Sequence, residues 1–176
     1  MTLPKIILLV GMPASGKSTI GAALATRLGY RFTDTDILIK KQENKSVPAI
    51  FAQYGEPYFR EKEKQLIPQL ATLPNPTVIA TGGGLPCFWD NMEQLLQVGT
   101  VVFLDTELRT LYQRLLAKQA ARPLVAGQSP EQLNRWLTER YNLRVPFYQK
   151  AHFRISVTDS ERVEEIVTKI TDTLTA

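Results

Sequence analysis

The chain is poor in the residue types that build metal and redox centres. Its 176 residues include one cysteine, Cys87, and one histidine, His152. A single cysteine excludes a disulfide within the chain and any zinc site built from several cysteines. We expect Cys87 to be an inert, partly buried thiol and His152 to have a structural role.

Long apolar runs are also absent. No run approaches the ~20 residues that a membrane-spanning helix needs, so we expect no membrane partner. The sequence opens Met-Thr-Leu-Pro-Lys and enters an apolar stretch at once, which leaves no room for a signal peptide and favours a cytoplasmic protein. A content of 44% hydrophobic and 22% charged residues is typical of a globular chain, and we expect one domain over residues 1–176.

Clustered charge is missing too, although the net charge is +4. The longest basic run is the pair Lys40-Lys41, and the arginines are spread through predicted helices and loops. A nucleic-acid-binding surface needs a denser basic patch, so we expect no nucleic-acid partner. A small positive excess suits an enzyme whose substrates are anions, and we expect it to act as a monomer.

A glycine-rich loop of defined spacing lies near the start of the chain. Residues 11–18 read Gly-Met-Pro-Ala-Ser-Gly-Lys-Ser, directly after an apolar run and directly before a helical pattern. Glycines let the backbone aim N–H groups at phosphate oxygens, Lys17 can reach the β- and γ-phosphates, and the Ser18 hydroxyl can bind Mg²⁺. A turn that merely caps the helix is the alternative. The strand-loop-helix context favours a site for a nucleoside triphosphate.

Apolar strands and amphipathic helices alternate along the chain. The pattern predicts strands at residues 5–10, 30–33, 78–80, 100–104 and 153–157. It predicts helices at residues 17–28, 37–42, 48–54, 57–73, 90–97, 107–118, 130–143 and 161–174. Nearly continuous apolar strands between helices are typical of a parallel sheet covered on both faces. We therefore expect an α/β fold with a five-stranded parallel sheet flanked by helices on both faces.

Ligands of such sheets bind beyond the carboxyl ends of the strands. Asp34 and Asp36 follow the second strand, and on an extended segment their side chains would point to opposite sides, one toward Mg²⁺ and the other toward an acceptor. Capping of the next helix is the alternative, and one aspartate could do both. The three glycines at 82–84 follow the third strand and permit close backbone approach to a ligand.

Two further residues lie at comparable positions. Arg122 is next to a proline in a glycine-bounded loop and suits a lid arginine that reaches over phosphates, with a solvated loop charge as the alternative. Asp105 follows the fourth strand, where a Walker-B aspartate would lie, but we expect it to cap the next helix.

Together these motifs resemble the shikimate kinase family over nearly the whole chain. The resemblance is carried by GMPASGKST at 11–19, DTD at 34–36, FRE at 59–61 with Glu63, TGGG at 81–84, RPL at 122–124 and RVPFY at 144–148. It implies a P-loop, nucleoside-monophosphate-kinase-like fold with a substrate-binding insert at about 35–65 and a lid at about 120–129. It also implies transfer of the ATP γ-phosphoryl group to the 3-hydroxyl of shikimate, in the route to aromatic amino acids.

The resemblance implies roles for individual residues as well. Lys17, Asp36 and Arg122 would be catalytic, and Arg114 and the segment around Arg162 would lie near adenine. ATP would be bound by Ala14, Ser15, Gly16, Lys17, Ser18, Thr19 and Arg122. Mg²⁺ would be bound by Ser18 and Asp34. Shikimate would be bound by Asp36, Arg60, Gly82, Gly83, Gly84 and Arg144, since two arginines can fork a carboxylate and Asp36 can accept from a hydroxyl.

One segment departs from the family pattern. Residues 85–91, Leu-Pro-Cys-Phe-Trp-Asp-Asn, are bulkier and more aromatic than the small residues expected after the glycines, which affects the shape of the acceptor pocket. Another small-metabolite or nucleotide kinase of the same fold is the alternative function. A non-catalytic ATP-binding module is disfavoured because Lys17, Ser18 and Asp34 are all present, and a GTPase because no Asn-Lys-x-Asp motif occurs.

Overall fold

The computed structural model describes residues 3–117 and 127–176. Its strands form one sheet in the order β2-β3-β1-β4-β5, and every neighbouring pair is parallel. The strands are β1 (Ile6–Val10), β2 (Arg31–Asp34), β3 (Thr77–Ala80), β4 (Thr100–Thr106) and β5 (Phe153–Val157). The predicted five-stranded parallel α/β sheet is confirmed for the described part of the chain.

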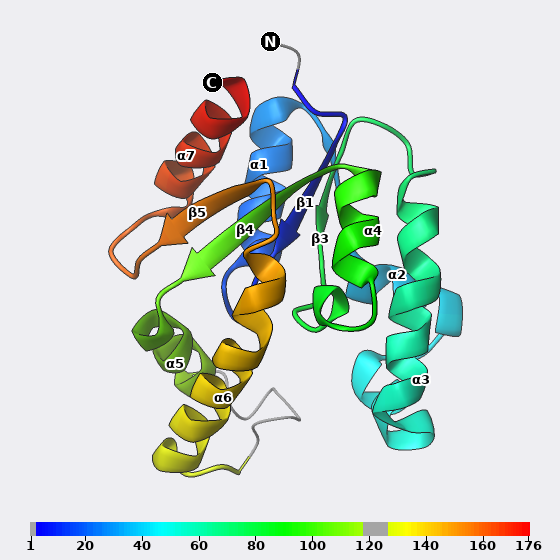
Figure 1. Ribbon diagram of the computed structural model, residues 1–176, viewed down its shortest axis with the longest axis vertical. Helices are drawn as coiled ribbons and strands as arrows, with labels where there is room; N and C mark the ends of the chain where they lie inside the picture. The colour runs from blue at the N-terminus through cyan, green and yellow to red at the C-terminus, as the bar shows by residue number, and fades with distance from the viewer. Residues whose placement is uncertain (1–2, 118–126) are drawn as a thin grey trace.

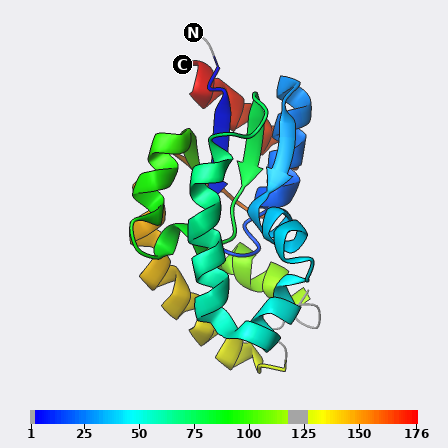
Figure 2. The same ribbon diagram turned by 90° about the vertical axis from the view of Figure 1, so that its right-hand side faces the viewer.

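Helices cover both faces of this sheet. They are α1 (Lys17–Leu28), α2 (Thr35–Glu43), α3 (Val47–Leu70), the 3₁₀ turn η1 (Leu85–Cys87), α4 (Asn91–Val98), α5 (Leu108–Ala117), α6 (Pro130–Tyr148) and α7 (Val163–Thr175). The central strand β1 shows why two layers form, since all five of its residues are buried. Ile7 and Leu9 lie in the core that α1 and α7 complete, and Leu8 and Val10 lie in the core that α3, α4 and α6 complete. Figure 2 shows α3 and α4 on one side of the strands and α1 on the other.

The strand order fixes where a ligand can bind. The chain moves from β1 to β2 and β3 on one side of the sheet and to β4 and β5 on the other, so the connections part at β1. Ligands of open parallel sheets bind at such a switch point, beyond the carboxyl ends of the strands. In Figure 1 the strand arrows point toward η1, α5 and α6 and away from both termini. No helix in the described ranges is both long and apolar enough to cross a membrane.

Several helix boundaries differ from the prediction. Helix α2 begins at Thr35 because the Asp34 side chain accepts from the Asp36 N–H at 2.9 Å and caps it. The break between the two helices predicted at 48–54 and 57–73 is confirmed, since α3 is interrupted by the non-helical Gly55 at φ 79°, although the second helix ends at Leu70. Helix α6 continues to Tyr148 although Pro146 lies inside it.

Candidate active site

The loop between β1 and α1 has a backbone that its glycines make possible. Gly11 lies at φ 147° and Gly16 at φ 94°, and a Cβ on Gly11 would lie only 2.8 Å from the Leu104 carbonyl oxygen. Gly16 is the N-cap of α1 and has no side chain that could cap the helix. The N–H groups of the first helical turn are therefore free to bind an anion. The loop therefore has the form of a phosphate-binding site.

The Lys17 side chain lies over this loop and is buried. Its Nζ donates to the carbonyl oxygens of Gly11 at 2.9 Å and Met12 at 2.8 Å. Two other elements also hold the loop, since Thr106 Oγ1 in β4 donates to the Ser15 carbonyl at 3.3 Å and Arg114 Nη1 in α5 donates to the Ala14 carbonyl at 3.2 Å. The lysine charge is thus fixed at the point where phosphates would bind.

A cavity of about 450 Å³ lies beside the loop. Five of the six predicted ATP-binding residues outside the lid line it: Ala14, Gly16, Lys17, Ser18 and Thr19. The sixth, Ser15, is fully buried and instead accepts from Lys17 Nζ at 3.3 Å. The far wall comes from α5 and from the start of α7, through Arg114, Ala117, Glu161, Val163 and Ile166.

Part of this far wall was predicted. Arg114 and the segment around Arg162 were expected to lie near adenine, and Arg114, Glu161 and Val163 do line the cavity. Arg162 itself points to solvent, with its side chain 79% exposed and paired with Glu165 at 3.5 Å. The other apolar wall residues carried no signal, because a helical stripe facing a cavity has the same pattern as one facing the core.

Ser18 and Asp34 meet beside the loop. Ser18 Oγ in α1 donates to Asp34 Oδ2 at the end of β2 at 2.7 Å. A hydroxyl and a carboxylate oxygen are hard donors that suit Mg²⁺. In the described ranges no three His, Cys, Asp or Glu side chains gather as a metal site. Mg²⁺ is usually bound by one or two protein carboxylates together with substrate phosphates and water.

The prediction that Asp34 and Asp36 alternate on an extended segment is wrong. Asp36 lies in the first turn of α2, because Asp34 ends the strand and caps the helix. The two carboxylates nevertheless point to different groups: Asp34 Oδ2 to Ser18, and Asp36 Oδ1 to the space beside Gly82. A helical turn, not strand alternation, separates them.

The glycines at 82–84 each leave room for a different neighbour. A Cβ on Gly82 would lie 2.9 Å from both Asp36 Oδ1 and Glu63 Oε1, and one on Gly84 would lie 2.7 Å from Arg60 Cζ. A Cβ on Gly83 would press on the ring of Pro13. The loop therefore packs between the phosphate loop and the polar residues of α2 and α3, where no larger residue would fit.

Asp36 and Glu63 form a buried acidic pair around Gly82. Asp36 Oδ1 and Glu63 Oε1 are both buried, and neither has a hydrogen-bond partner among the described residues. Burial is the largest cause that raises the pKa of Asp36 to about 6, and the Asp34 charge adds to it. Burial likewise raises the pKa of Glu63 to about 7, against the opposing charge of Arg60. Such groups are suited to exchange protons near neutral pH.

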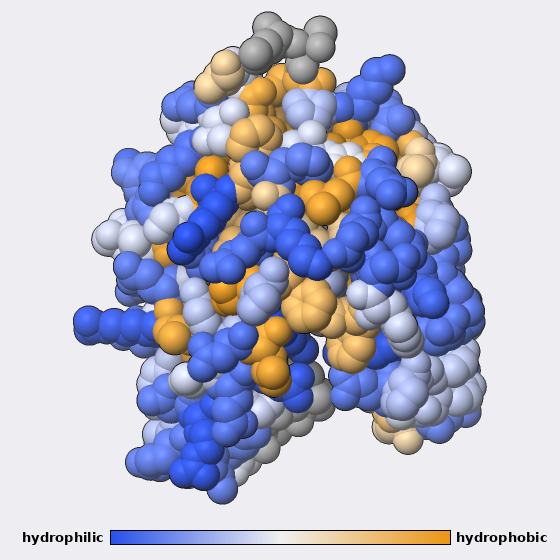
Figure 3. Space-filling model, viewed as in Figure 1, coloured by the Kyte–Doolittle hydropathy of each residue, from blue (hydrophilic) through white to orange (hydrophobic). Residues whose placement is uncertain are grey.

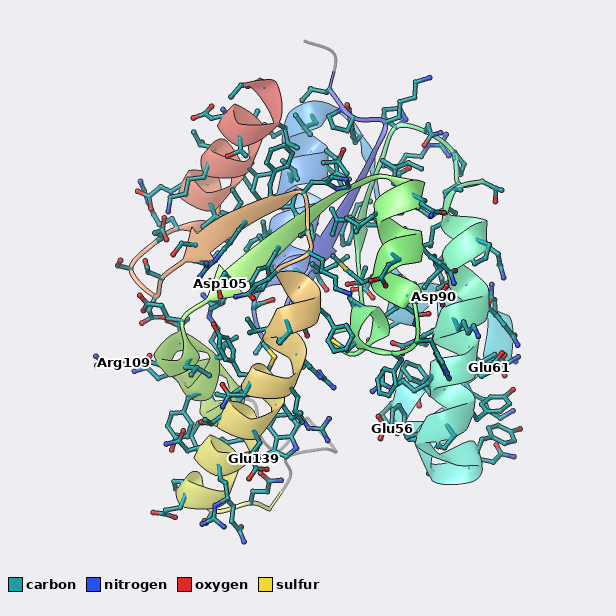
Figure 4. All side chains as sticks on the ribbon, in the orientation of Figure 1. Glu56, Glu61, Asp90, Asp105, Arg109 and Glu139 are labelled. Carbon is teal, nitrogen blue, oxygen red and sulfur yellow. The ribbon has the colours of Figure 1, made fainter. Side chains whose placement is uncertain are left out.

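Arg60 on α3 is buried and held by two carboxylates. Its Nη1 donates to Glu63 at 2.6 Å, and its Nε and Nη2 donate to Glu56 at 3.1 and 2.8 Å. A guanidinium has five N–H donors, so two remain for a ligand. Arg144 on α6 is also buried. Figure 4 places Glu56 on α3 and Glu139 on α6, on the two sides of the space between these helices.

Tyr148 connects α6 to the glycine loop. Its hydroxyl donates to the Gly83 carbonyl at 2.6 Å, and the residue is fully buried with its ring 5.2 Å from that of Phe103. Arg144 lies one helical turn earlier on the same helix. The glycine loop and this arginine are thereby fixed relative to each other.

Comparison with known proteins decides the family. The shikimate kinase family model matches residues 13–175. The chain belongs to the shikimate kinase family. A shikimate kinase of Clostridium botulinum (strain Loch Maree / Type A3) is 44% identical over 156 residues, 88% of this chain and 89% of the relative. A shikimate kinase of Bacteroides fragilis is 37% identical over 164 residues, 93% of this chain and 91% of the relative.

Solved shikimate kinases have the same fold. The enzyme from Bacteroides thetaiotaomicron superposes with a TM-score of 0.91 at 32% identity, covering 98% of this chain and 99% of that one. The enzyme from Acinetobacter baumannii in complex with shikimate superposes with a TM-score of 0.85 at 34% identity, covering 97% and 93%. The predicted family and fold are confirmed. Members of this family are kinases that use ATP as a substrate.

The remaining predictions have different outcomes. Arg122 and most of the predicted lid lie outside the described residues. Asp105 does not cap α5, because β4 continues to Thr106; its carboxylate accepts from Arg154 Nε at 2.7 Å and from Tyr141 Oη at 3.2 Å (Figure 4). His152 Nδ1 accepts from the Val101 N–H at 3.0 Å, a structural contact as expected. Burial raises the pKa of the Cys87 thiol to about 11, which fits an inert thiol.

Proposed function

We propose that this chain transfers the γ-phosphoryl group of ATP to the 3-hydroxyl of shikimate, giving 3-phosphoshikimate and ADP. The observation that carries the proposal is the unpartnered Asp36 Oδ1 beside the glycine loop. The charges of Lys17 in the phosphate loop and of Arg60 on α3 both act on this carboxylate. A monomeric state and a cytoplasmic location remain predictions.

The loop after β1 would bind the phosphates of ATP. The N–H groups of the loop and of the first turn of α1 would bind phosphate oxygens, and the adenosine would occupy the cavity that Arg114 lines. Lys17 would neutralise charge on the transferring group. Ser18 and Asp34 would hold Mg²⁺, which when bound neutralises phosphate charge.

Shikimate binding falls to three segments that surround Gly82. Arg60 still has two N–H donors after its bonds to Glu56 and Glu63, and the buried Arg144 on α6 acts on the same Glu63. Together they would bind the carboxylate of shikimate, because a guanidinium matches a carboxylate with two parallel hydrogen bonds. The backbone at 82–84 and Asp36 would position the ring hydroxyls.

Asp36 would act as the proton acceptor. As the 3-hydroxyl oxygen of shikimate bonds to the γ-phosphorus, the bond from that phosphorus to the β,γ-bridging oxygen breaks and its electrons leave with ADP. The hydroxyl proton passes to Asp36 Oδ1. A carboxyl with a pKa of about 6 is mostly ionised at neutral pH and still basic enough to accept this proton.

The division of the chain into core, insert and lid is part of the proposal. The insert at about 35–65 would supply Asp36 and Arg60, and the lid at about 120–129 would supply Arg122 over the phosphates. Of the lid, the described part is Gly127 to Ser129, where Ser129 caps α6 by accepting from the Gln132 N–H at 3.2 Å. The role of Arg122 stays a prediction.

Product identification tests the reaction. The purified chain is incubated with ATP, Mg²⁺ and shikimate, and the products are followed by ³¹P nuclear magnetic resonance. We expect the γ-phosphate signal to be replaced by a phosphomonoester coupled to the proton on carbon 3 of shikimate. A phosphomonoester on another carbon, or release of inorganic phosphate alone, would contradict the proposed transfer.

A further inference from the structure

A second cavity, of about 420 Å³, lies between α6 and the segment after η1. This volume is in the range of pockets that bind small organic ligands. Three aromatic rings line it: Phe88 after η1, and Trp136 and Phe147 on α6. Figure 3 shows the surface hollowed between the part of the molecule built by α6 and the part built by α3.

Two cations enter the same cavity from α6. Trp136, Arg140 and Arg144 follow one another at intervals of four residues, so they lie along one face of the helix. The Arg140 guanidinium lies 4.9 Å from the centre of the Trp136 ring. Within residues 3–117 and 127–176, neither arginine has a carboxylate within ion-pair distance.

The second cavity carries more positive charge than nearby carboxylates neutralise. Partial burial, together with the charges of Arg144 and Arg60, lowers the pKa of Arg140, while Glu56 opposes this. Glu139, the acidic side chain in the cavity wall, is exposed. The site therefore favours an anion next to its aromatic wall.

The aromatic wall includes the segment that departs from the family pattern. Phe88 belongs to the bulky stretch at 85–91, and its ring centre lies 4.6 Å from the Arg60 guanidinium. Arg60 thus packs against one face of the Phe88 ring, and Phe88 also lines the second cavity. Small side chains at this position would leave the cavity without its third aromatic wall.

We propose that this cavity binds planar aromatic carboxylates, with the ring packed among Phe88, Trp136 and Phe147 and the carboxylate bound by Arg140 and Arg144. Aromatic rings prefer offset-stacked or edge-to-face contacts, and a guanidinium pairs with a carboxylate through two hydrogen bonds. The proposal rests on the proposed function in one respect, because Arg144 is also assigned to shikimate. An aromatic carboxylate therefore competes with shikimate and not with ATP.

Trp136 reports binding directly. The chain has two tryptophans, so Trp89→Phe leaves Trp136 as the only tryptophan, whose emission can be excited apart from that of tyrosine. In this background, 4-hydroxybenzoate should quench the fluorescence saturably in the absence of ATP and shikimate. The neutral 4-hydroxybenzamide and the non-aromatic cyclohexanecarboxylate should bind at least about tenfold more weakly.

Paired variants separate a built site from general attraction to a basic helix. Arg140→Gln and Arg144→Gln should each weaken 4-hydroxybenzoate by about tenfold, because each removes a charge-assisted contact. Arg135→Gln, an exposed arginine on α6 outside the cavity wall, should leave the binding unchanged. Initial rates should show 4-hydroxybenzoate raising the KM for shikimate without raising the KM for ATP.

The two proposals can fail independently. Saturable quenching that needs the carboxylate and weakens in Arg140→Gln supports the aromatic site even if shikimate is not turned over, which would contradict the proposed function alone. No quenching, equal binding by the three arginine variants, or equal binding of cyclohexanecarboxylate would overturn the aromatic site even in an active shikimate kinase.

Discussion

At the scale of single residues, catalysis depends on where each charge is held. Lys17 Nζ is fixed over the phosphate loop by two carbonyl oxygens. Lys17→Ala should lower kcat about a hundredfold, since removing one preorganised charge contact typically costs on the order of 3 kcal/mol. Circular dichroism should show a folded protein, and the exposed Lys40→Ala serves as the control. A folded variant with more than half of the wild-type turnover would refute this role for Lys17.

The two aspartates after β2 should have separable roles. Asp34→Asn should raise the Mg²⁺ concentration needed for half-maximal rate, because an amide is a poorer ligand for a hard cation. Asparagine caps helices as well as aspartate does, so α2 should stay capped. Asp36→Asn should lower kcat by about a hundredfold or more through loss of the proton acceptor, with little change in MgATP affinity. Titrations that give both variants the same defects would reject the distinction.

Glu63 should make stability depend on pH. Burial raises its pKa from 4.5 to about 7, so the folded chain holds this proton more tightly than the unfolded chain. That stability is fully present below about pH 4.5 and is lost as the pH rises through about 7. Glu63→Gln should therefore unfold with a free energy on the order of 2 kcal/mol above that of wild type at about pH 8.

Urea unfolding at several pH values, without ligands, measures this effect. The excess stability of Glu63→Gln should shrink as the pH falls and vanish below about pH 4.5, where the wild-type carboxyl is mostly protonated in both states. Glu61→Gln, exposed on the same helix, is the control. A difference that stays constant with pH would mean that Glu63 acts on stability through packing alone.

Some of these residues were predictable from sequence and others were not. The spacing of residues 11–18 predicted the positions of Lys17 and Ser18, because the function of the motif dictates that spacing. The raised pKa of Glu63, and the hydrogen bonds of Arg60 to both Glu56 and Glu63, were not predictable. Both depend on burial and on neighbours from other segments, which a single sequence does not contain.

At the scale of secondary-structure elements, α6 links the two halves of the acceptor site. Tyr148→Phe removes the hydrogen bond to the Gly83 carbonyl and leaves that group unpaired, which should cost about 1 kcal/mol of stability. The KM for shikimate should rise several-fold, since the glycine loop loses its anchor, while the KM for MgATP stays unchanged. Tyr54→Phe, which is 41% exposed, is the control. Equal changes in both KM values would show a general loss of structure.

The helix boundaries show where local pattern is overruled. A proline disfavours helix at the preceding residue, and the predicted end of α6 at residue 143 lies just before Pro146. In the structure α6 continues to Tyr148, whose buried ring and hydroxyl contacts lie in the core. Tertiary contacts thus outweigh the local preference. At α2 the cap was recognised as an alternative, but its consequence for the geometry of Asp36 was not.

At the scale of the whole molecule, topology brings distant segments together. The alternation of apolar strands and helices predicted a parallel sheet, and ligands of such sheets bind at the carboxyl ends of their strands. This rule placed the loop after β1, Asp34 and the glycines at 82–84 in one region. It could not place residues carried by long helices, so the cavity formed by η1 and α6 was not predicted.

ADP release over a panel of acceptors tests the central claim most directly. The wild-type chain is assayed with MgATP and shikimate, quinate, gluconate or AMP, with Asp36→Asn as the matched control for background ATP hydrolysis. The account predicts that shikimate is turned over at least about a hundredfold faster than the other acceptors and that Asp36→Asn abolishes most of this rate. No turnover of shikimate, together with turnover of another acceptor, would contradict it.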